Sequence, residues 1–151
     1  GDLFVFVFFG PVAVAGTYYL QTFAAPREVW IASLAPGLLS VALLTVNNLR
    51  DADTDAKTGK RTLAVRFGKG FAKFEYFGAV FAAAFAVPMY LYSSTGKLTL
   101  AAVAMIATAM ITPAIRVVFT YRDPAVLNGV LARTGLLLLV YSALFAAAWL
   151  R

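Results

Sequence analysis

The stretch VWIASLAPGLLSVALLTVNN, residues 29–48, leads directly into LRDADTDAKTGKRT, residues 49–62. The first part has the length of about 20 apolar residues that a helix needs to cross the hydrocarbon core of a bilayer. The second part holds three carboxylates, Asp51, Asp53 and Asp55, followed by a cluster of bases. Charged groups beside a bilayer are costly and are normally kept for function. The junction therefore predicts a spanning helix that ends in a functional site.

The composition of the whole chain is that of an integral membrane protein. Of the 151 residues, 62% are hydrophobic and 13% are charged, and the mean hydropathy is +0.81, whereas a soluble domain carries about 25% charged residues. The net charge is +6, which fits the usual excess of bases in cytoplasmic loops. The sequence lacks the interleaved aromatic and basic residues that bind single strands, so we expect no nucleic-acid partner.

The chain contains no Cys and no His. This excludes disulfides, thiolate nucleophiles, thiolate or imidazole metal ligands, and the usual general base at neutral pH. A bound metal would therefore be held through oxygen, which favours Mg²⁺, Ca²⁺ or Mn²⁺.

Five segments are apolar and long enough to span a bilayer. They are residues 3–22, 29–48, 74–92, 98–119 and 130–150. We therefore predict an all-α fold, a polytopic transmembrane bundle of about five helices that forms a single domain over residues 1–151. The amino terminus has neither the basic region nor the cleavage site of a signal peptide, and we expect the chain to begin inside a larger protein.

Bases are concentrated in two of the connections between these spans. The connection 50–73 holds Arg50, Lys57, Lys60, Arg61, Arg66, Lys69 and Lys73, and the connection 120–129 holds Arg122, flanked by Arg116 and Arg133. Because Lys and Arg are enriched in cytoplasmic loops, both connections, including the Asp-rich and basic loop 47–73, are predicted to be cytoplasmic. The amino terminus would then lie inside and the carboxyl terminus outside.

The polar segment has the residue types of a metal–phosphate site. Asn47, Asp51 and Asp55 are four residues apart, so they share one face if the helix continues past residue 48, whereas Asp53 points elsewhere. Neighbouring carboxylates repel unless a cation lies between them. Mg²⁺ takes one or two carboxylates and fills its shell with water and substrate phosphate. The bases that could neutralise a diphosphate are Lys57, Lys60, Arg61 and Arg66.

Other motifs explain the segment less well. An EF-hand loop needs Gly at its sixth position and Glu at its twelfth, and counting from Asp51 these positions hold Ala56 and Thr62. A P-loop is broken by Thr54 and Arg61. A solvated loop whose bases contact anionic lipid explains the bases but not the carboxylates. Residue types alone leave this loop and the metal–phosphate site as alternatives.

The pattern NNLRDADTDAKTGKRTLAVRFG, residues 47–68, closely resembles the second aspartate-rich motif of the UbiA-type intramembrane prenyltransferases. It is most similar to the branch that acts on 1,4-dihydroxy-2-naphthoate in menaquinone synthesis. Two weaker matches are GTYYLQT, residues 16–22, and LNGVLAR, residues 127–133. The resemblance extends along nearly the whole chain.

This resemblance implies a bundle of about nine helices in which two Asp-rich motifs face each other across a cavity open to lipid. It implies a prenyltransferase of a bacterial plasma membrane with Mg²⁺ as cofactor, transferring a chain from polyprenyl diphosphate to the aromatic acceptor 1,4-dihydroxy-2-naphthoate with loss of CO₂ and diphosphate. Asp51 and Asp55 would be the Mg²⁺ ligands, with Asp53 as an accessory. The diphosphate would be bound or oriented by Lys60, Arg61 and Arg66.

The resemblance also suggests residues that orient the substrate. Asn47 and Asn48 would orient ligands or contact substrate. Tyr18 and Tyr19 could line a pocket for the aromatic acceptor, although Tyr at the end of a span is more often an interfacial anchor. Gln21 is costlier in a span, and we expect it to be functional or to bridge helices.

The chain departs from the family pattern because the first motif, of the NxxxDxxxD type, is absent. The other acids, Asp2, Glu28, Glu75 and Asp123, do not have that spacing, and five spans are present instead of nine. We therefore expect the C-terminal half of the enzyme, with weak or no activity without the N-terminal half that carries the first motif.

Three alternatives remain open at this point. The chain could be a non-catalytic or partner-dependent membrane subunit, or an enzyme with 4-hydroxybenzoate or homogentisate as acceptor. A cation-transport module would also use an Asp cluster. Transport sites usually lie near the midplane of the membrane, whereas these carboxylates lie at the end of a span.

Overall fold

The computed structural model describes residues 1–150, and this part of the chain is built of helices without any strand. In chain order the elements are α1 (Asp2–Val7), η1 (Phe8–Gly16), α2 (Thr17–Thr22), α3 (Arg27–Lys57), α4 (Leu63–Phe81), η2 (Ala82–Ala86), α5 (Val87–Thr95), α6 (Leu98–Thr120), η3 (Pro124–Val126) and α7 (Leu127–Trp149). Contiguous elements combine into five helices long and apolar enough to cross a membrane. The prediction of an all-α bundle with five spans is therefore confirmed.

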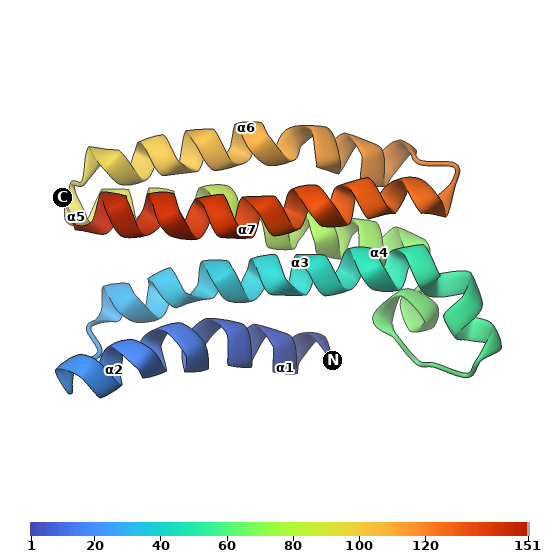
Figure 1. Ribbon diagram of the computed structural model, residues 1–151, viewed down its shortest axis with the longest axis horizontal. Helices are drawn as coiled ribbons and strands as arrows, with labels where there is room; N and C mark the ends of the chain where they lie inside the picture. Colours follow the sequence, from blue (N-terminus) through green and yellow to red (C-terminus); the bar gives the residue numbers. More distant parts are fainter. Residues whose placement is uncertain (151) are drawn as a thin grey trace.

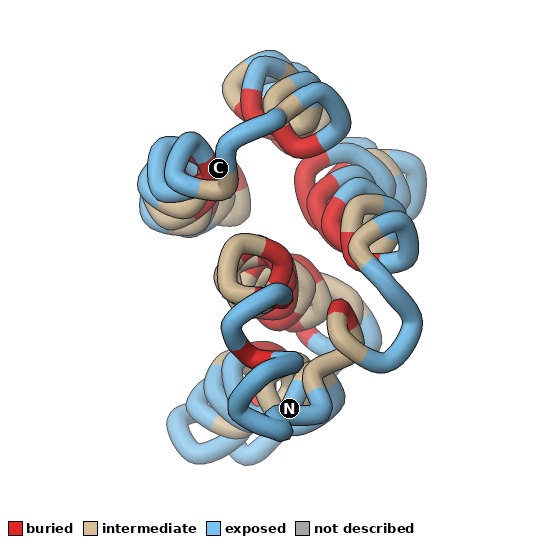
Figure 2. Tube along the Cα trace, turned by 90° about the vertical axis from the view of Figure 1, so that its right-hand side faces the viewer, coloured by how far each residue is buried: buried red, intermediate tan, exposed pale blue. Residues whose placement is uncertain are grey.

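The long helices lie side by side, and the chain reverses direction at each connection (Figure 1). α3 occupies the middle of the bundle and packs against α1 and η1 on one side and against α4 and α7 on the other (Figure 2). α6 closes the bundle by packing against α5 and α7. The fully buried side chains Leu39, Val46 and Leu49 belong to α3, so the core is arranged around this helix.

Two glycines bring the first helix close to α3. A Cβ added to Gly37 would lie 2.7 Å from the carbonyl oxygen of Phe6, and one added to Gly10 would lie 2.8 Å from the carbonyl oxygen of Ser33. Small residues that let backbones approach are typical of helix interfaces in membranes. Gly10 and Gly37 thus set the separation between η1 and α3.

Two prolines coincide with the two π-helical stretches. Pro11 lies inside η1, and Pro88 follows η2 at the start of α5. Proline has no amide hydrogen, and its ring collides with the carbonyl four residues earlier. A π-helical turn widens the backbone at such a point. The helices therefore continue through both prolines instead of ending there.

The segment expected to be a connection, residues 50–73, is largely helical. α3 continues past residue 48 to Lys57, α4 begins at Leu63, and only residues 58–62 lie outside helices. The hydroxyl of Thr62 accepts a hydrogen bond from the Val65 amide at 3.3 Å and caps α4. Apolar residues mark where a helix leaves the bilayer, but the helix itself can continue into water. This segment projects from one end of the bundle (Figure 1).

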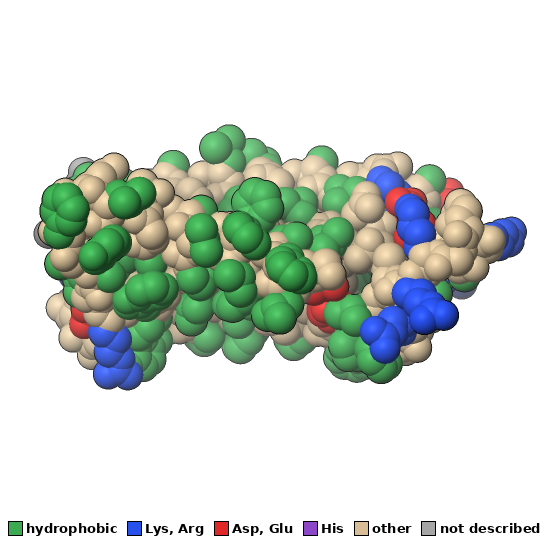
Figure 3. Space-filling model, turned by 90° about the horizontal axis from the view of Figure 1, so that it is seen from below, with side chains coloured by type: hydrophobic (Ala, Val, Ile, Leu, Met, Phe, Trp, Pro, Cys, Tyr) green, Lys and Arg blue, Asp and Glu red, His purple; other side chains and the backbone are tan. Residues whose placement is uncertain are grey.

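Charge is distributed unevenly along the bundle. Hydrophobic side chains cover the middle of the face shown in Figure 3, and most of its Lys and Arg side chains gather at the end that carries the turn between α3 and α4. An apolar band with a basic end is the distribution that a bilayer and its headgroups favour. The Asp-rich end of α3 therefore lies at the edge of the apolar band.

Candidate functional site at the Asp-rich end of the bundle

The continuation of α3 to Lys57 aligns Asn47, Asp51 and Asp55 on one face of the helix, because residues four apart lie one above the other. Successive members of this row are about 6 Å apart along the axis, at 1.5 Å per residue. Asp53 points elsewhere, and its carboxylate accepts a hydrogen bond from the Lys69 ammonium on α4 at 2.7 Å. The alignment expected from the spacing is therefore present.

Asp51 is held by the neighbouring Arg50. The guanidinium Nε donates to Asp51 Oδ1 at 2.8 Å, and Nη2 donates to Oδ2 at 2.7 Å. The same group donates to the side-chain oxygen of Asn47 at 2.9 Å and to that of Asn128, near the start of α7, at 2.8 Å. One guanidinium thus connects the Asp-rich face of α3 to a second helix.

Asp55 is only 5% exposed and is held by Lys60, whose ammonium donates to Asp55 Oδ1 at 2.8 Å. This hydrogen bond raises the pKa of Lys60 above its usual value. A raised lysine pKa stabilises the fold below the ordinary pKa, and the contribution is lost only as the pH rises through the raised value. Lys60 therefore stays charged and neutralises the buried carboxylate of Asp55 at neutral pH.

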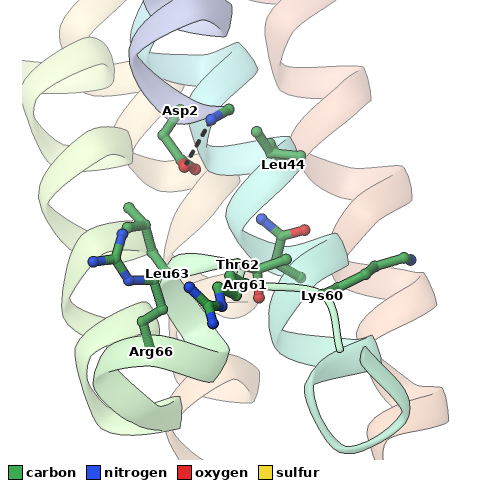
Figure 4. Close-up of a pocket in the computed structure, with 9 residues that line it drawn as sticks. Asp2, Leu44, Lys60, Arg61, Thr62, Leu63 and Arg66 are labelled. Carbon is green, nitrogen blue, oxygen red and sulfur yellow. Dashed lines mark ion pairs between the residues drawn. The ribbon is translucent and has the colours of Figure 1, made fainter. Parts of the chain in front are cut away.

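A cavity of about 410 Å³ opens between the start of α1, Leu44 and Asn48 of α3, and residues 60–66; the carboxylates of Asp51, Asp53 and Asp55 do not line it. This volume lies within the range of about 300–1,000 Å³ that is usual for small-molecule sites. Arg61 and Arg66 lie on the same side of the cavity, while Lys60 extends away from them (Figure 4). The lining residues are Gly1, Asp2, Leu44, Asn48, Lys60, Arg61, Thr62, Leu63 and Arg66.

The backbone around the turn explains why the two arginines line the same cavity. Gly59 has φ 76° and turns the chain back after α3. Gly68 has φ 86° and ψ 164° and interrupts the helix after Phe67, so that the first turn of α4 is set off from the rest. Glycine adopts a positive φ without strain, and the combination of angles at Gly68 is accessible essentially to glycine alone. Gly59 and Gly68 thereby bracket the short segment that carries both Arg61 and Arg66.

The carboxylates of α3 are not gathered into one cluster. Among residues 1–150 there is no group of three or more His, Cys, Asp or Glu side chains arranged to hold a metal ion. Each carboxylate pairs with a different base: Asp51 with Arg50, Asp53 with Lys69, and Asp55 with Lys60. Asp51 and Asp55, one turn apart and with only oxygen donors, nevertheless fit Mg²⁺, which needs only one or two carboxylates.

Some of the predicted site residues lie elsewhere. Tyr18, Tyr19 and Gln21 belong to α2, at the opposite end of the bundle (Figure 1). Tyr18 lines a separate apolar cavity of about 250 Å³ together with residues of η1, α3 and α7, including Ala32. Asp51 is 19 residues beyond Ala32 on α3, or about 28 Å along the axis. The structure does not bring these three side chains to the carboxylates.

The remaining predicted residues are divided between the cavity and its surroundings. Asn48 lines the cavity, whereas Asn47 accepts from Arg50 and Lys57 is exposed at the end of α3 without lining the cavity.

Three residues of the site, Arg50, Asn128 and Asp2, were absent from the predicted set. Arg50 stands next to Asp51 in the sequence, and Asn128 falls in the stretch 127–133. The two motifs are far apart in the chain, so no spacing predicted their contact. Asp2 reaches the cavity only because α1 packs against α3.

The fold and site together define an all-helical membrane protein with carboxylates and bases at one end of the bundle. The sequence model of the UbiA prenyltransferase family matches residues 1–133, and the chain belongs to that family. The resemblance noted from residues 47–68 is thereby confirmed. Membership and the five spanning-length helices make the chain an integral membrane protein.

Several curated proteins are similar to the chain. A Mycobacterium leprae 1,4-dihydroxy-2-naphthoate octaprenyltransferase is 36% identical over 148 residues, which cover 98% of this chain and 49% of the relative. A Haemophilus influenzae protein of the same name is 53% identical over 68 residues, 45% of this chain and 22% of the relative.

A human UbiA prenyltransferase domain-containing protein 1 is 33% identical over 76 residues, 50% of this chain and 22% of the relative. The chain thus spans at most about half the length of these relatives. No solved structure matches it.

Proposed function

We propose that the chain forms part of a prenyltransferase of menaquinone synthesis, which joins a polyprenyl chain from polyprenyl diphosphate to 1,4-dihydroxy-2-naphthoate and releases diphosphate and CO₂. The observation that carries the proposal is the cavity lined by Arg61, Arg66 and Lys60, the last of which is paired with Asp55 of α3. Family membership supports prenyl transfer, and the names of the relatives from M. leprae and H. influenzae favour this acceptor.

The diphosphate group would bind between the two arginines. A guanidinium presents a planar fork of donors that matches phosphate oxygens, and a pair of them neutralises more of the charge than one. Lys60 lines the same cavity, and Lys57 adds positive charge nearby at the end of α3. The position of the cavity at the edge of the apolar band keeps the diphosphate near water while the polyprenyl tail remains in lipid.

Mg²⁺ would be held by Asp51 and Asp55, with Asp53 in an accessory role. The side-chain oxygens of Asn47 and Asn48 are further neutral donors beside this row. When bound, the ion neutralises diphosphate oxygens and stabilises the leaving group. In this structure Arg50 neutralises the carboxylate of Asp51, and Lys60 neutralises that of Asp55. Each carboxylate is therefore paired with a positive charge before Mg²⁺ or diphosphate binds.

The reaction proceeds by cleavage of the allylic carbon–oxygen bond, whose electron pair leaves with the diphosphate. Arg61 and Arg66 stabilise the negative charge that develops on it. The electron-rich ring then attacks the allylic cation at the carbon that bears the carboxylate. A carbon–carbon bond forms, and CO₂ leaves while its bonding electrons return to the ring. A site closed to water protects the cation from hydrolysis.

The whole reaction requires a second Asp-rich motif, which the family resemblance implies and which we propose to come from residues outside this chain. In a bacterium the protein would lie in the plasma membrane, with the Asp-rich end of α3 facing the cytoplasm.

The proposal is tested with membranes that contain this chain together with the polypeptide that supplies the other Asp-rich motif. They are incubated with octaprenyl diphosphate and 1,4-dihydroxy-2-naphthoate, and the prenylated product and CO₂ are measured. Asp51→Asn and Asp55→Asn should each lower the rate about a hundredfold, the loss typical of removing one transition-state contact. Glu28→Gln makes the same chemical change at the other end of α3 and should leave the rate unchanged.

Two results would contradict the proposal: full activity of both Asp variants, or no product from any allylic diphosphate and aromatic acceptor. Product formed only from 4-hydroxybenzoate or homogentisate would correct the acceptor and leave the reaction class in place.

A further inference from the structure

Arg50 occupies a place that the proposed chemistry does not explain. Its guanidinium makes four hydrogen bonds, two to Asp51, one to Asn47 and one to Asn128. We infer that Arg50 is a positioning residue that fixes the carboxylate of Asp51 and, through Asn128, makes the Asp-rich site depend on the position of α7. The inference rests on the proposed function only where it concerns binding of diphosphate.

The contact between Arg50 and Asn128 joins residues that are 78 positions apart in the chain. In the described part of the protein, no other side-chain hydrogen bond connects α3 with α7. The two helices also pack against each other, and both contribute buried apolar residues to the core, among them Leu49, Val130 and Leu137. Apolar packing permits small sliding movements, whereas a hydrogen bond to a charged fork has a defined geometry. Arg50 therefore fixes the relative position of the two helices at the Asp-rich end.

The Arg50–Asp51 pair is accessible to ligands. The two side chains are 27% and 35% exposed, unlike the nearly buried carboxylate of Asp55. A cation that approaches Asp51 must compete with the guanidinium, because both are positive. The side-chain oxygens of Asn47 and Asn128 are neutral acceptors that can hold Arg50 in place while Asp51 turns toward the cation. The asparagines thus let the arginine release Asp51 without leaving the site.

A lysine at position 50 cannot make the same set of hydrogen bonds as Arg50. Its ammonium is a point charge on a flexible chain, so it cannot contact both carboxylate oxygens and two amide oxygens in one plane. Arg50→Lys keeps the positive charge but removes the planar guanidinium that makes the four hydrogen bonds. Asn128→Ala removes only the bond to α7. If Asn128 acts through Arg50, the two changes together should weaken the site no more than Arg50→Lys alone.

The first measurement follows hydrogen–deuterium exchange in the first two turns of α7, with the chain in lipid nanodiscs and no ligand present. Loss of a hydrogen bond to a charged group corresponds to a factor of about ten, so exchange there should accelerate several-fold in Arg50→Lys and in Asn128→Ala. Arg122→Lys, an exposed arginine just before η3, is the matched control and should behave as the unmodified chain. Unchanged exchange in Arg50→Lys would overturn the inference.

The second measurement is calorimetric binding of inorganic diphosphate in the presence of Mg²⁺. We expect about tenfold weaker binding in Arg50→Lys, a smaller loss in Asn128→Ala, and no further loss in the double variant. Additive losses would show that Asn128 acts independently of Arg50 and would contradict the coupling. Absence of binding to the unmodified chain would instead count against the proposed function, and the exchange measurement would still decide the role of Arg50.

Discussion

At the scale of single residues, the three carboxylates of α3 differ in what surrounds them. Asp55 is nearly buried and paired with Lys60, Asp51 is partly exposed and held by Arg50, and Asp53 is exposed beside Lys69. Burial of a charge is costly unless it is paired and hydrogen-bonded. The structure therefore assigns the most restrained position to Asp55, an intermediate position to Asp51 and the least restrained position to Asp53.

Removal of the Asp53 charge should have little effect on the site. Its partner Lys69 is also exposed, and ion pairs between exposed groups contribute about 0–1 kcal/mol. We expect Asp53→Asn to weaken Mg²⁺-dependent diphosphate binding less than threefold, whereas Asp55→Asn should weaken it at least tenfold. Calorimetric titration of both variants with Mg²⁺ and diphosphate checks this. Equal losses in the two variants would show that Asp53 is a full ligand.

Gly68 is the residue whose backbone matters most for the cavity. Its φ of 86° and ψ of 164° are strained for any residue with a Cβ, at a cost of about 1–3 kcal/mol. Gly68→Ala should lower the thermal unfolding temperature in detergent and weaken diphosphate binding, because the turn carrying Arg66 moves. Gly70→Ala, two residues on in the helix with open space around its Cβ, should do neither. A Gly68→Ala variant with unchanged binding would contradict this account of the loop.

The positions of the polar side chains along α3 were predictable from the sequence, but their partners were not. The four-residue spacing of Asn47, Asp51 and Asp55 predicted their alignment on the condition that the helix continues past residue 48, because the alignment then depends only on helix geometry. The partners of these side chains depend on rotamers and on helices distant in the sequence. The contact of Arg50 with Asn128 and the entry of Asp2 into the cavity were for that reason not predictable.

At the scale of elements, α3 is both the centre of the core and the carrier of the carboxylates. Its 31 residues extend about 46 Å at 1.5 Å per residue, which exceeds the hydrocarbon thickness of about 30 Å. The excess places the Asp-rich end outside the apolar band. Hydropathy located the apolar part of this helix correctly. The continuation of α3 through the polar residues 49–57 was not predicted, because a polar segment outside the hydrocarbon core can be either a helix or a loop.

The close approach of α1 and η1 to α3 gives a prediction about helix packing. In Gly37→Ala the added Cβ would lie 2.7 Å from the Phe6 carbonyl oxygen, so the first helix must move away. Overpacking of this kind costs about 1–3 kcal/mol, and we expect a lower thermal unfolding temperature. Gly135→Ala in α7, where a Cβ meets nothing within 4 Å, is the control. Equal stability of the two variants would show that the interface is not tightly packed.

At the scale of the whole molecule, the fold class, the number of spans and the family were predictable because hydropathy and one long motif determine them. The cavity was not, since it forms where residues 1–2, 44–48 and 60–66 meet. Those segments are adjacent only because α1 and α4 pack against the same central helix. This packing depends on the fit of many side chains from different helices, so it cannot be predicted from a local sequence pattern.

The orientation in the membrane is a prediction about the whole molecule. The chain has no cysteine, so Thr58→Cys and Ser93→Cys each create a single reactive thiol, one at each end of the bundle. In intact bacterial cells a membrane-impermeant maleimide should label Ser93→Cys and should label Thr58→Cys only after permeabilisation. The reverse pattern would place the Asp-rich end outside the cell and would contradict the assignment from the positive-inside rule.

Arg61 and Arg66 are proposed to form a diphosphate site at the cavity that also includes Lys60, the partner of Asp55. The most direct measurement is calorimetric titration of the chain in nanodiscs with inorganic diphosphate, with and without Mg²⁺. We predict Mg²⁺-dependent binding that is weakened at least tenfold in the double variant Arg61→Gln/Arg66→Gln and is unchanged in Arg122→Gln. Binding of equal strength in all three proteins, or no binding to the unmodified chain, would contradict the claim.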